Sequence, residues 1–243
     1  MVFQNMNKDK KIIVEAHRGA SGYEKDNTFE SFEKAVSLKA DAIELDIRKT
    51  KDGKIVVFHD LIFKEKSIND YTYDELIIKS KEDGFIVPLL VDVLKKFKGR
   101  ILLDIEIKEE GYEQEIIDLI LSILKINEFY IRSFSESTIK KVKEINKDIY
   151  AILLIGAEFP KYGIFSRFGE IFPKAKIKRS NCDAVSPHYR LLLFGFVKRM
   201  HKKNQKVYVW TVNNEETMKK VYAKKVDGIV TNYPDIAMKL LNK

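Results

Sequence analysis

The stretch Ala42-Ile43-Glu44-Leu45-Asp46-Ile47 decides the fold, because it predicts a strand that is buried and yet carries two carboxylates. Residues two apart in a strand point to the same face, so Glu44 and Asp46 share one face while Leu45 points to the other. Buried carboxylates are costly unless a cation compensates their charge. The stretch therefore predicts a polar site built on a buried strand.

The residues that follow predict a hairpin. Lys51-Asp52-Gly53 is a turn signal, and the apolar run Ile55-Val56-Val57-Phe58 begins too soon after it for a parallel crossover. This run should therefore fold back antiparallel on the first strand. With the turn centred between the aspartate and the glycine, His59 would lie opposite Asp46.

Short β-branched runs alternate with longer amphipathic stretches along the rest of the chain, which indicates βαβ units. The near-continuous apolar character of the short runs is typical of parallel strands buried on both faces. Eight runs predict an α/β fold of the TIM type, a (β/α)8 barrel that forms one domain over residues 1–243. The segments 48–87 and 156–182 interrupt this alternation of strands and helices. They predict a β-hairpin extension after strand two and an insertion after strand five. The predicted strands are Ile12–Ala16, Ala42–Ile47, Ile101–Ile107, Phe129–Ser133, Ile149–Ile155, Asp183–Ser186, Val207–Thr211 and Gly228–Thr231.

Several helix starts are marked by capping residues. Asn27 with Glu30 is typical of a capping box, and Pro88 stands where the next helix can begin. Ser135 and Asn213 are caps for two later helices. Whether Asn27 only caps a helix or also belongs to a site stays open.

Composition excludes several classes of protein. Of the 243 residues, 45% are hydrophobic, enough for a large core, and 33% are charged. No stretch approaches the roughly 18 apolar residues of a membrane span. Met1–Lys11 lacks the apolar region of a signal peptide, and the single Cys182 cannot form an internal disulfide. These features favour a cytoplasmic protein, with a position peripheral to the membrane left open.

The formal net charge is +8. A basic surface can attract phosphate, nucleic acid or anionic lipid. Because the lysines are spread along most predicted helices among Glu and Asp, we attribute the surplus to a generally high lysine content. The sequence has no recognised nucleic-acid-binding motif and no sustained basic helix, so we expect no nucleic-acid partner.

Further polar residues stand at the ends of the predicted strands. His17-Arg18 closes the first strand, Glu106 and Lys108 share one face of the third, and His59 ends the hairpin. Catalytic residues in this fold gather at the C-terminal ends of the strands. We therefore expect two histidines, three carboxylates and two cations at one end of the barrel. A purely structural pairing of the carboxylates with the arginine would leave negative charge uncompensated.

In their order along the chain, these motifs resemble the glycerophosphodiester phosphodiesterase family, and the resemblance spans nearly the whole sequence. The motifs that carry it are His17-Arg18-Gly19-Ala20-Ser21-Gly22, Asn27-Thr28, Glu44-Leu45-Asp46, Lys51-Asp52-Gly53, His59-Asp60, Pro88, Glu106-Ile107-Lys108, Ser133-Phe134, Trp210-Thr211-Val212-Asn213 and Asp227-Gly228-Ile229. The chain departs from the family's pattern at Lys25-Asp26, where Pro-Glu is frequent, and at Asn232, where Asp is common. It also lacks the family's usual arginine soon after His59-Asp60.

The resemblance implies an enzyme that hydrolyses glycerophosphodiesters to glycerol 3-phosphate and an alcohol. An all-carboxylate site favours one hard divalent cation, Mg²⁺ or Ca²⁺, over Zn²⁺. Trp210 is a candidate for substrate contact, with core packing as the alternative. The implied roles are metal ligation by Glu44, Asp46 and Glu106, acid–base catalysis by His17 and His59, and phosphate contact by Arg18 and Lys108.

Two other functions stay open. The segment 156–182 is aromatic and basic, which suits a membrane interface and a lysophospholipase-D-like activity on lipids, although packing on the barrel would also explain it. A non-catalytic barrel that binds phosphodiesters would be supported by a missing ligand or histidine, and none is missing. The sequence leaves open the alcohol head group, the identity of the cation, which histidine is the base, and the oligomeric state.

Overall fold

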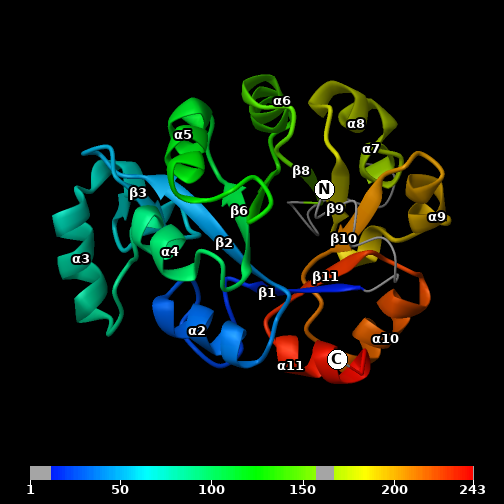
Figure 1. The fold of residues 1–243 in the computed structure, drawn as a ribbon, viewed down its shortest axis with the longest axis horizontal. Coiled ribbons are helices and arrows are strands. Elements are labelled where there is room, and N and C mark those ends of the chain that lie inside the picture. The colour runs from blue at the N-terminus through cyan, green and yellow to red at the C-terminus, as the bar shows by residue number, and fades with distance from the viewer. Residues whose placement is uncertain (1–11, 157–166, 243) are drawn as a thin grey trace.

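The computed structural model of the chain describes residues 12–156 and 167–242. Within this part of the chain, eight parallel strands pair in the order β1-β11-β10-β9-β8-β7-β6-β2, and β2 pairs again with β1, so the barrel is closed (Figure 1). Every strand end lies within two residues of its predicted position. The strands are β1 (Ile13–His17), β2 (Ala42–Lys49), β6 (Leu102–Ile107), β7 (Phe129–Ser133), β8 (Ala151–Ile155), β9 (Ala184–Pro187), β10 (Lys206–Val209) and β11 (Gly228–Thr231).

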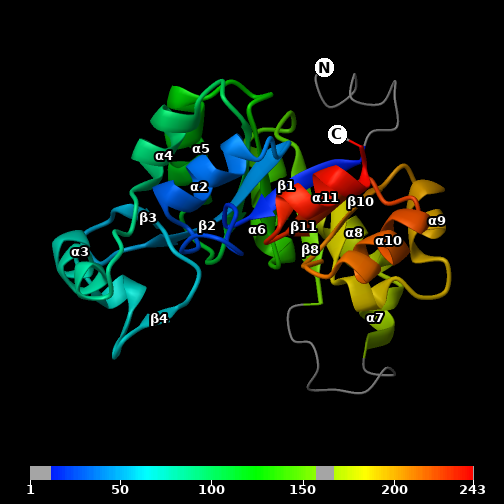
Figure 2. The ribbon, with the colours of Figure 1, turned by 90° about the horizontal axis from the view of Figure 1, so that it is seen from below.

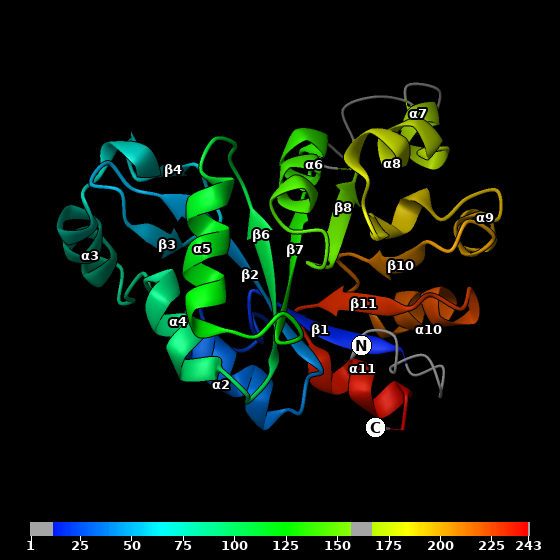
Figure 3. The same ribbon diagram turned by 45° about the horizontal axis from the view of Figure 1, so that its top comes forward.

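Helices surround the barrel and cover the outward faces of its strands (Figures 1 and 3). Their apolar sides are buried against it, as at Phe32, Leu94 and Ile117, which are fully inaccessible to solvent. The main helices are α2 (Phe29–Ser37), α4 (Leu90–Phe97), α5 (Glu113–Ile123), α6 (Glu136–Ile145), α8 (Lys174–Ser180), α9 (Phe196–His201), α10 (Glu215–Ala223) and α11 (Pro234–Leu240).

The predicted hairpin is present, but its predicted register was wrong by one residue. β3 (Ile55–Val57) pairs antiparallel with β2 through Ile47 and Val57, which places Phe58, not His59, opposite Asp46. The reason is the turn. A loop with Gly53 in the left-handed region (φ 79°) joins the strands, and Gly53 N–H donates to the carbonyl of Thr50. The hairpin is therefore centred on Asp52, half a residue earlier than a turn centred between Asp52 and Gly53, and this shifts the pairing by one residue.

Two segments extend from the barrel at the two places where the strand–helix alternation is interrupted, in residues 48–87 and 156–182. The first contains β3, β4 (Ile62–Phe63), β5 (Lys66–Ser67), η1 (Ile68–Asp70) and α3 (Tyr73–Glu82), with a small core of its own around Val56 and Leu76. The second contains α7 (Phe168–Ile171) and α8, and its residues 157–166 lie outside the described part. Figure 2 shows β4 and α7 on the same side of the molecule, at opposite flanks of the barrel.

The barrel interior contains a buried ionic layer that the sequence motifs did not predict. The guanidinium of Arg132 on β7 forms ion pairs with Glu15 on β1 and Asp104 on β6, and Tyr130 Oη donates to Glu15 Oε1 at 2.6 Å. All four side chains are almost completely buried. The two carboxylates share one guanidinium, and burial raises the pKa of Asp104 well above its usual range, so a proton rather than a second cation neutralises the surplus carboxyl in this layer.

Across residues 12–156 and 167–242, no helix is both long enough and apolar enough to cross a membrane.

Candidate active site

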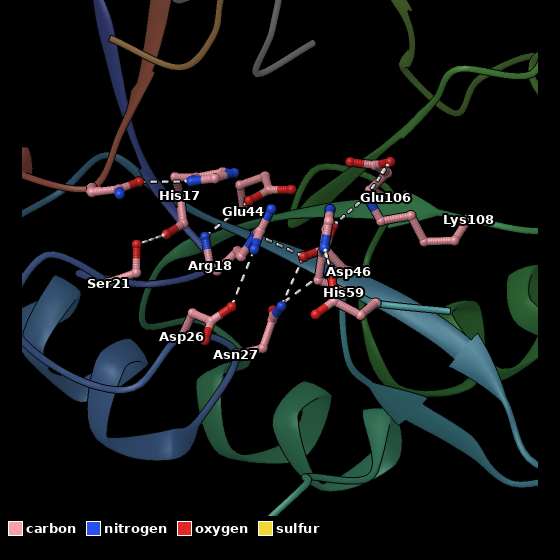
Figure 4. Close-up of polar contacts among 12 residues, drawn as sticks. His17, Arg18, Ser21, Asp26, Asn27, Glu44, Asp46, His59, Glu106 and Lys108 are labelled. Carbon is pink, nitrogen blue, oxygen red and sulfur yellow. Dashed lines mark hydrogen bonds and ion pairs between the residues drawn. The ribbon is translucent and has the colours of Figure 1, made fainter. Parts of the chain in front are cut away.

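The C-terminal ends of β1, β2 and β6, together with the loop after β3, bring together all of the predicted site residues except Trp210 (Figure 4). His17 is the last residue of β1, and Glu44 lies beside it across the β1–β2 pairing. Asp46 lies beside Glu106 across the β2–β6 pairing. Residues two apart in β2 face the same way, so both of its carboxylates point into the barrel mouth.

Glu44, Asp46 and Glu106 form a carboxylate triad. One oxygen from each carboxylate lies within 4.8 Å of the others. Among the described residues, this triad is the cluster of at least three His, Cys, Asp or Glu side chains that could hold a metal ion. Burial, together with the neighbouring Asp46, raises the pKa of Glu44 to about 8. Burial also raises the pKa of Glu106, although Lys108 opposes the shift. The triad is therefore a place where negative charge is crowded and poorly solvated, which a bound cation would relieve.

Two cations approach the triad. Lys108 Nζ lies 2.7 Å from Asp46 Oδ1 and 2.6 Å from Glu106 Oε1. Arg18 Nε forms an ion pair with Asp46 Oδ2 at 3.2 Å, and its Nη1 donates to Asp26 at 3.2 Å. Burial acts to raise the pKa of Asp46, but these two cations outweigh it and hold that pKa well below its usual range. With every group ionised, three carboxylates face two cations at the triad, so one negative charge remains.

Both predicted histidines lie at this end of the barrel, and each has one ring nitrogen engaged. His17 Nδ1 lies 2.7 Å from Asn232 Oδ1, and His59 Nδ1 lies 2.7 Å from Asp60 Oδ1. Both partner oxygens are acceptors, so the neutral imidazoles carry their proton on Nδ1 and leave Nε2 free to accept one. Burial, reinforced by Arg18, lowers the pKa of His17 to about 4. Burial also lowers the pKa of His59, although Asp46 acts in the opposite direction.

Asn27 belongs to the site rather than to the helix cap. Its Nδ2 donates to Asp46 Oδ2 at 2.7 Å, and Asp46 N donates back to Asn27 Oδ1 at 3.3 Å. The N-cap of α2 is Thr28, whose capping-box partner is Ser31, so the predicted pairing of Asn27 with Glu30 was wrong. Asn27 adopts a left-handed backbone (φ 57°), which asparagine tolerates better than most residues.

Trp210 lies just beyond the end of β10, on another side of the barrel mouth. Its indole N–H donates to the carbonyl of Ser186 at 2.8 Å, and its ring meets Phe134 and His188 edge-on. The side chain is only partly buried. It therefore has the hydrogen-bond partner expected for a packed indole and also a surface exposed at the mouth.

Asn232 and Asp26 are contacts of the site to which the sequence motifs assigned no role, although both positions depart from the pattern of the resembling family. Asn232 directly follows β11 and contacts His17, while Asp26 contacts Arg18. The rule that polar residues at strand ends face the site could have identified Asn232. Nothing local to Asp26 indicates its partner, because the contact depends on the path of the loop after β1.

Comparisons with known proteins agree with this geometry. The family model of the glycerophosphoryl diester phosphodiesterase family matches residues 17–236. YhdW of Bacillus subtilis (strain 168) is 34% identical over 94% of this chain and 97% of its own length. A glycerophosphodiester phosphodiesterase of Caldanaerobacter subterraneus subsp. tengcongensis is 30% identical over 96% of this chain and 99% of its own.

Among solved structures, an Oleispira antarctica phosphodiesterase in complex with the product sn-glycerol-3-phosphate has the same fold. It superposes with a TM-score of 0.80 at 20% identity, over 95% of this chain and 97% of its own. The predicted TIM barrel and the resemblance noted from the motifs are thus both confirmed. The chain belongs to the glycerophosphoryl diester phosphodiesterase family, a family of phosphoric diester hydrolases.

Proposed function

We propose that this chain, acting as one barrel domain over residues 1–243, hydrolyses glycerophosphodiesters to glycerol 3-phosphate and an alcohol with the help of one divalent cation. The observation that carries the proposal is the buried triad Glu44, Asp46 and Glu106 at the barrel mouth, with a histidine on either side. The family match supports the reaction class. The product named in the Oleispira antarctica complex supports the glycerol 3-phosphate half of the substrate.

The triad fits a hard cation. Its three ligands are all carboxylates, the donors that Mg²⁺ and Ca²⁺ prefer, and no described cysteine or histidine joins the group. The raised pKa of Glu44 indicates that the negative charge there is undercompensated without the ion. When bound, such an ion polarises the phosphate and stabilises the charge that develops on it.

Arg18 and Lys108 are our candidates for the phosphate contacts. Both are held at the triad by Asp46, so their donors lie beside the residues that would hold the cation, where they could bind the substrate's phosphate. Lys108 is nearly buried and keeps its charge, because the carboxylates raise its pKa despite the burial. Charge-assisted hydrogen bonds from such groups are among the strongest available to a phosphate. Trp210 would contact the rest of the substrate at the opposite wall.

The two histidines would move the protons. One Nε2 accepts the proton of the attacking hydroxyl, which belongs either to water or to the substrate's own glycerol 2-hydroxyl; in the second case a cyclic phosphate forms, and water then opens it to glycerol 3-phosphate. The other histidine gives a proton to the oxygen of the departing alcohol, so that no alkoxide is released. The neutral, Nδ1-protonated form of His17 suits the base role in the free protein. His59, which is less buried, would then be the acid.

An assay of product release tests this proposal. Purified protein with a divalent cation should release glycerol 3-phosphate from glycerophosphocholine or glycerophosphoethanolamine, measured by coupled oxidation of the product. Failure to release it from any glycerophosphodiester would refute the proposal and favour the non-catalytic binding barrel.

A second candidate is a lysophospholipase-D-like activity at a membrane surface. Its support is α7 and its C-cap, where Phe168 and Phe172 are 66% and 37% exposed in the segment 156–182. Other aromatic residues of this segment, such as Phe159, Tyr162 and Phe165, lie outside the described residues. Faster release of lysophosphatidate from lysolipids than of glycerol 3-phosphate from glycerophosphocholine would favour this candidate.

A further inference from the structure

Three exposed phenylalanines stack against one another beside the barrel. Phe168 at the start of α7 and Phe172 at its C-cap have ring centroids 4.5 Å apart, and Phe172 stacks at 6.4 Å on Phe194, which follows η3 (Tyr189–Leu191). Their exposed fractions are 66%, 37% and 71%. We call these three residues the phenylalanine platform. Large apolar side chains that cluster in solvent are uncommon unless the cluster binds something.

Arg199 on α9 holds the platform together. Its Nε donates to the carbonyl of Phe194 at 3.1 Å, and its Nη2 donates to the carbonyl of Ile171 at 2.8 Å. Its guanidinium also lies 4.2 Å from the centroid of the Phe172 ring. One side chain thus ties together two segments that are more than twenty residues apart. The relative position of the three rings is therefore fixed by specific side-chain contacts.

Phe194 combines a strained, left-handed backbone with a ring that is exposed to solvent. Its φ is 49°, in the left-handed region, and the following Gly195 is also left-handed at 65°. A bulky residue in this region is a genuine outlier, and such strain persists only where the surroundings impose it. Core packing does not explain a phenylalanine here, because most of its side chain is exposed.

The platform lies on the catalytic side of the barrel. Its two segments follow β8 and β9, and connections that follow the strands leave from the end where the carboxylate triad lies. On the other flank, Leu61 and Ile62 are 48% and 61% exposed at β4. Figures 2 and 3 both show β4 and α7 projecting from one side of the molecule. Exposed apolar residues therefore flank the mouth on both sides.

The platform also lies in the basic part of the chain. Residues 167–203 contain ten lysines and arginines and only two acidic residues, a net charge of +8, which equals that of the whole sequence. Positive and negative residues are therefore equal in number in the rest of the chain. The surplus of positive charge is concentrated in this segment, so a generally high lysine content does not explain it. Some of these cations are paired, such as Arg179 with Glu136, but Lys174 and Lys198 are exposed close to the platform in sequence.

We infer that the phenylalanine platform docks this protein onto an anionic phospholipid surface with the barrel mouth facing the lipid. Aromatic rings inserted at the headgroup level, among cations that meet anionic lipid, form an interfacial binding site. A protein partner could bind the exposed rings without the positive charge, and a nucleic acid could bind the positive charge without the rings. An anionic lipid surface accounts for both features together. The inference rests on the proposed function only in identifying the mouth as the side that must meet the substrate.

Vesicle sedimentation tests the inference with the intact chain of residues 1–243. The protein should sediment with vesicles of phosphatidylcholine and phosphatidylglycerol, more weakly at high salt, and much less with phosphatidylcholine alone. Because each ring would leave water for the lipid interface, the loss of one ring should weaken vesicle binding by about tenfold or more.

Phe194→Gly is the most informative variant, because glycine suits the left-handed backbone. It should keep or raise the melting temperature while it weakens vesicle binding, and Phe168→Ser should weaken binding similarly. Ile126→Ser is the matched control, since Ile126 is 37% exposed in the loop before β7, at the opposite end of the barrel. It should leave vesicle binding unchanged.

The outcomes separate the inference from the proposed function. Wild-type protein that does not sediment, or phenylalanine variants that sediment like wild type, would overturn the platform. All three variants should hydrolyse glycerophosphocholine at the wild-type rate. If none of the proteins releases glycerol 3-phosphate but binding still depends on the phenylalanines, the hydrolysis fails and the platform stands.

Discussion

The substitution Asn232→Asp tests whether His17 acts as the general base or as the general acid. Asn232 Oδ1 lies 2.7 Å from His17 Nδ1, and Asn232 itself is fixed by its N–H to Asn213 Oδ1 at 2.8 Å and by its carbonyl to Gly22 N–H at 3.0 Å. The substitution keeps the shape and replaces a neutral acceptor with a carboxylate. The new charge therefore arrives at a known distance from the imidazole.

The expected size of the effect follows from that distance. Burial lowers the pKa of His17 to about 4 in the native protein. An opposite charge within about 4–6 Å raises a pKa by roughly 1–3 units. The pH profile of kcat/KM, measured at saturating metal, should therefore shift by that amount on one side only. A shift of the acidic limb to higher pH identifies His17 as the base, and a shift of the alkaline limb identifies it as the acid.

Two further variants complete this experiment. Asn232→Ala leaves a buried N–H without its acceptor, which costs about 1–3 kcal/mol, so kcat should fall by roughly tenfold or more if the bond orients the ring. Asn204→Asp adds the same charge in an exposed loop before β10, at the opposite end of the barrel, and should leave the profile unchanged. If neither limb moves in Asn232→Asp and Asn232→Ala keeps full turnover, Asn232 does not position His17 and the reasoning is refuted.

Three other predictions follow from the site. Glu44→Gln and Asp46→Asn should each weaken divalent-cation binding by at least about tenfold in calorimetric titration while circular dichroism stays native; equal affinity would remove that residue from the ligand set. His17→Ala and His59→Ala should each lower kcat by about 10²–10⁴-fold, whereas His201→Ala, at the far end of the barrel, should keep it, and near-native turnover of either site variant would disprove its role. Burial raises the folded-state pKa of Glu44 from 4.5 to about 8, so the folded metal-free protein retains a proton that the unfolded chain has lost. Its free energy of unfolding should therefore fall by ~1 kcal/mol per pH unit as pH rises from about 6.5 to 8 in urea titrations, and a bound cation should abolish this slope; a rise with pH would contradict the environment assigned to Glu44.

The strands and the main site were predictable because their signals are local. A parallel strand buried on both faces is a continuous apolar run, and a polar residue that ends such a run faces the barrel mouth. Glu44, Asp46 and Glu106 could therefore be grouped from the sequence alone. The grouping required only the period of two along a strand and the closure of eight strands.

What could not be predicted depends on backbone detail or on distant partners. The hairpin register depended on one left-handed glycine, Gly53, in the turn. Asn27 has the composition of a helix cap, and only the loop geometry turns it toward Asp46. The pairing of Arg132 with Glu15 joins residues 117 positions apart, and nothing in either strand indicates the other.

The barrel's charge distribution was also visible in the sequence but was not recognised. A net charge summed over the whole chain conceals the fact that residues 167–203 contain all of the surplus. The functional meaning of that segment depends on the positions of Phe172 and Phe194, which the fold brings together through Arg199.

The central claim is that the carboxylate triad binds the cation that this phosphodiesterase reaction requires. Metal-stripped protein should release no glycerol 3-phosphate from glycerophosphocholine, and titration with Mg²⁺ or Ca²⁺ should restore release with saturation at one ion per chain. Glu106→Gln, which keeps the side chain's shape, should raise the concentration of ion needed for half-maximal activity by at least about tenfold. Full activity in the metal-stripped protein, or a Glu106→Gln titration that superposes on that of the wild type, would contradict the claim.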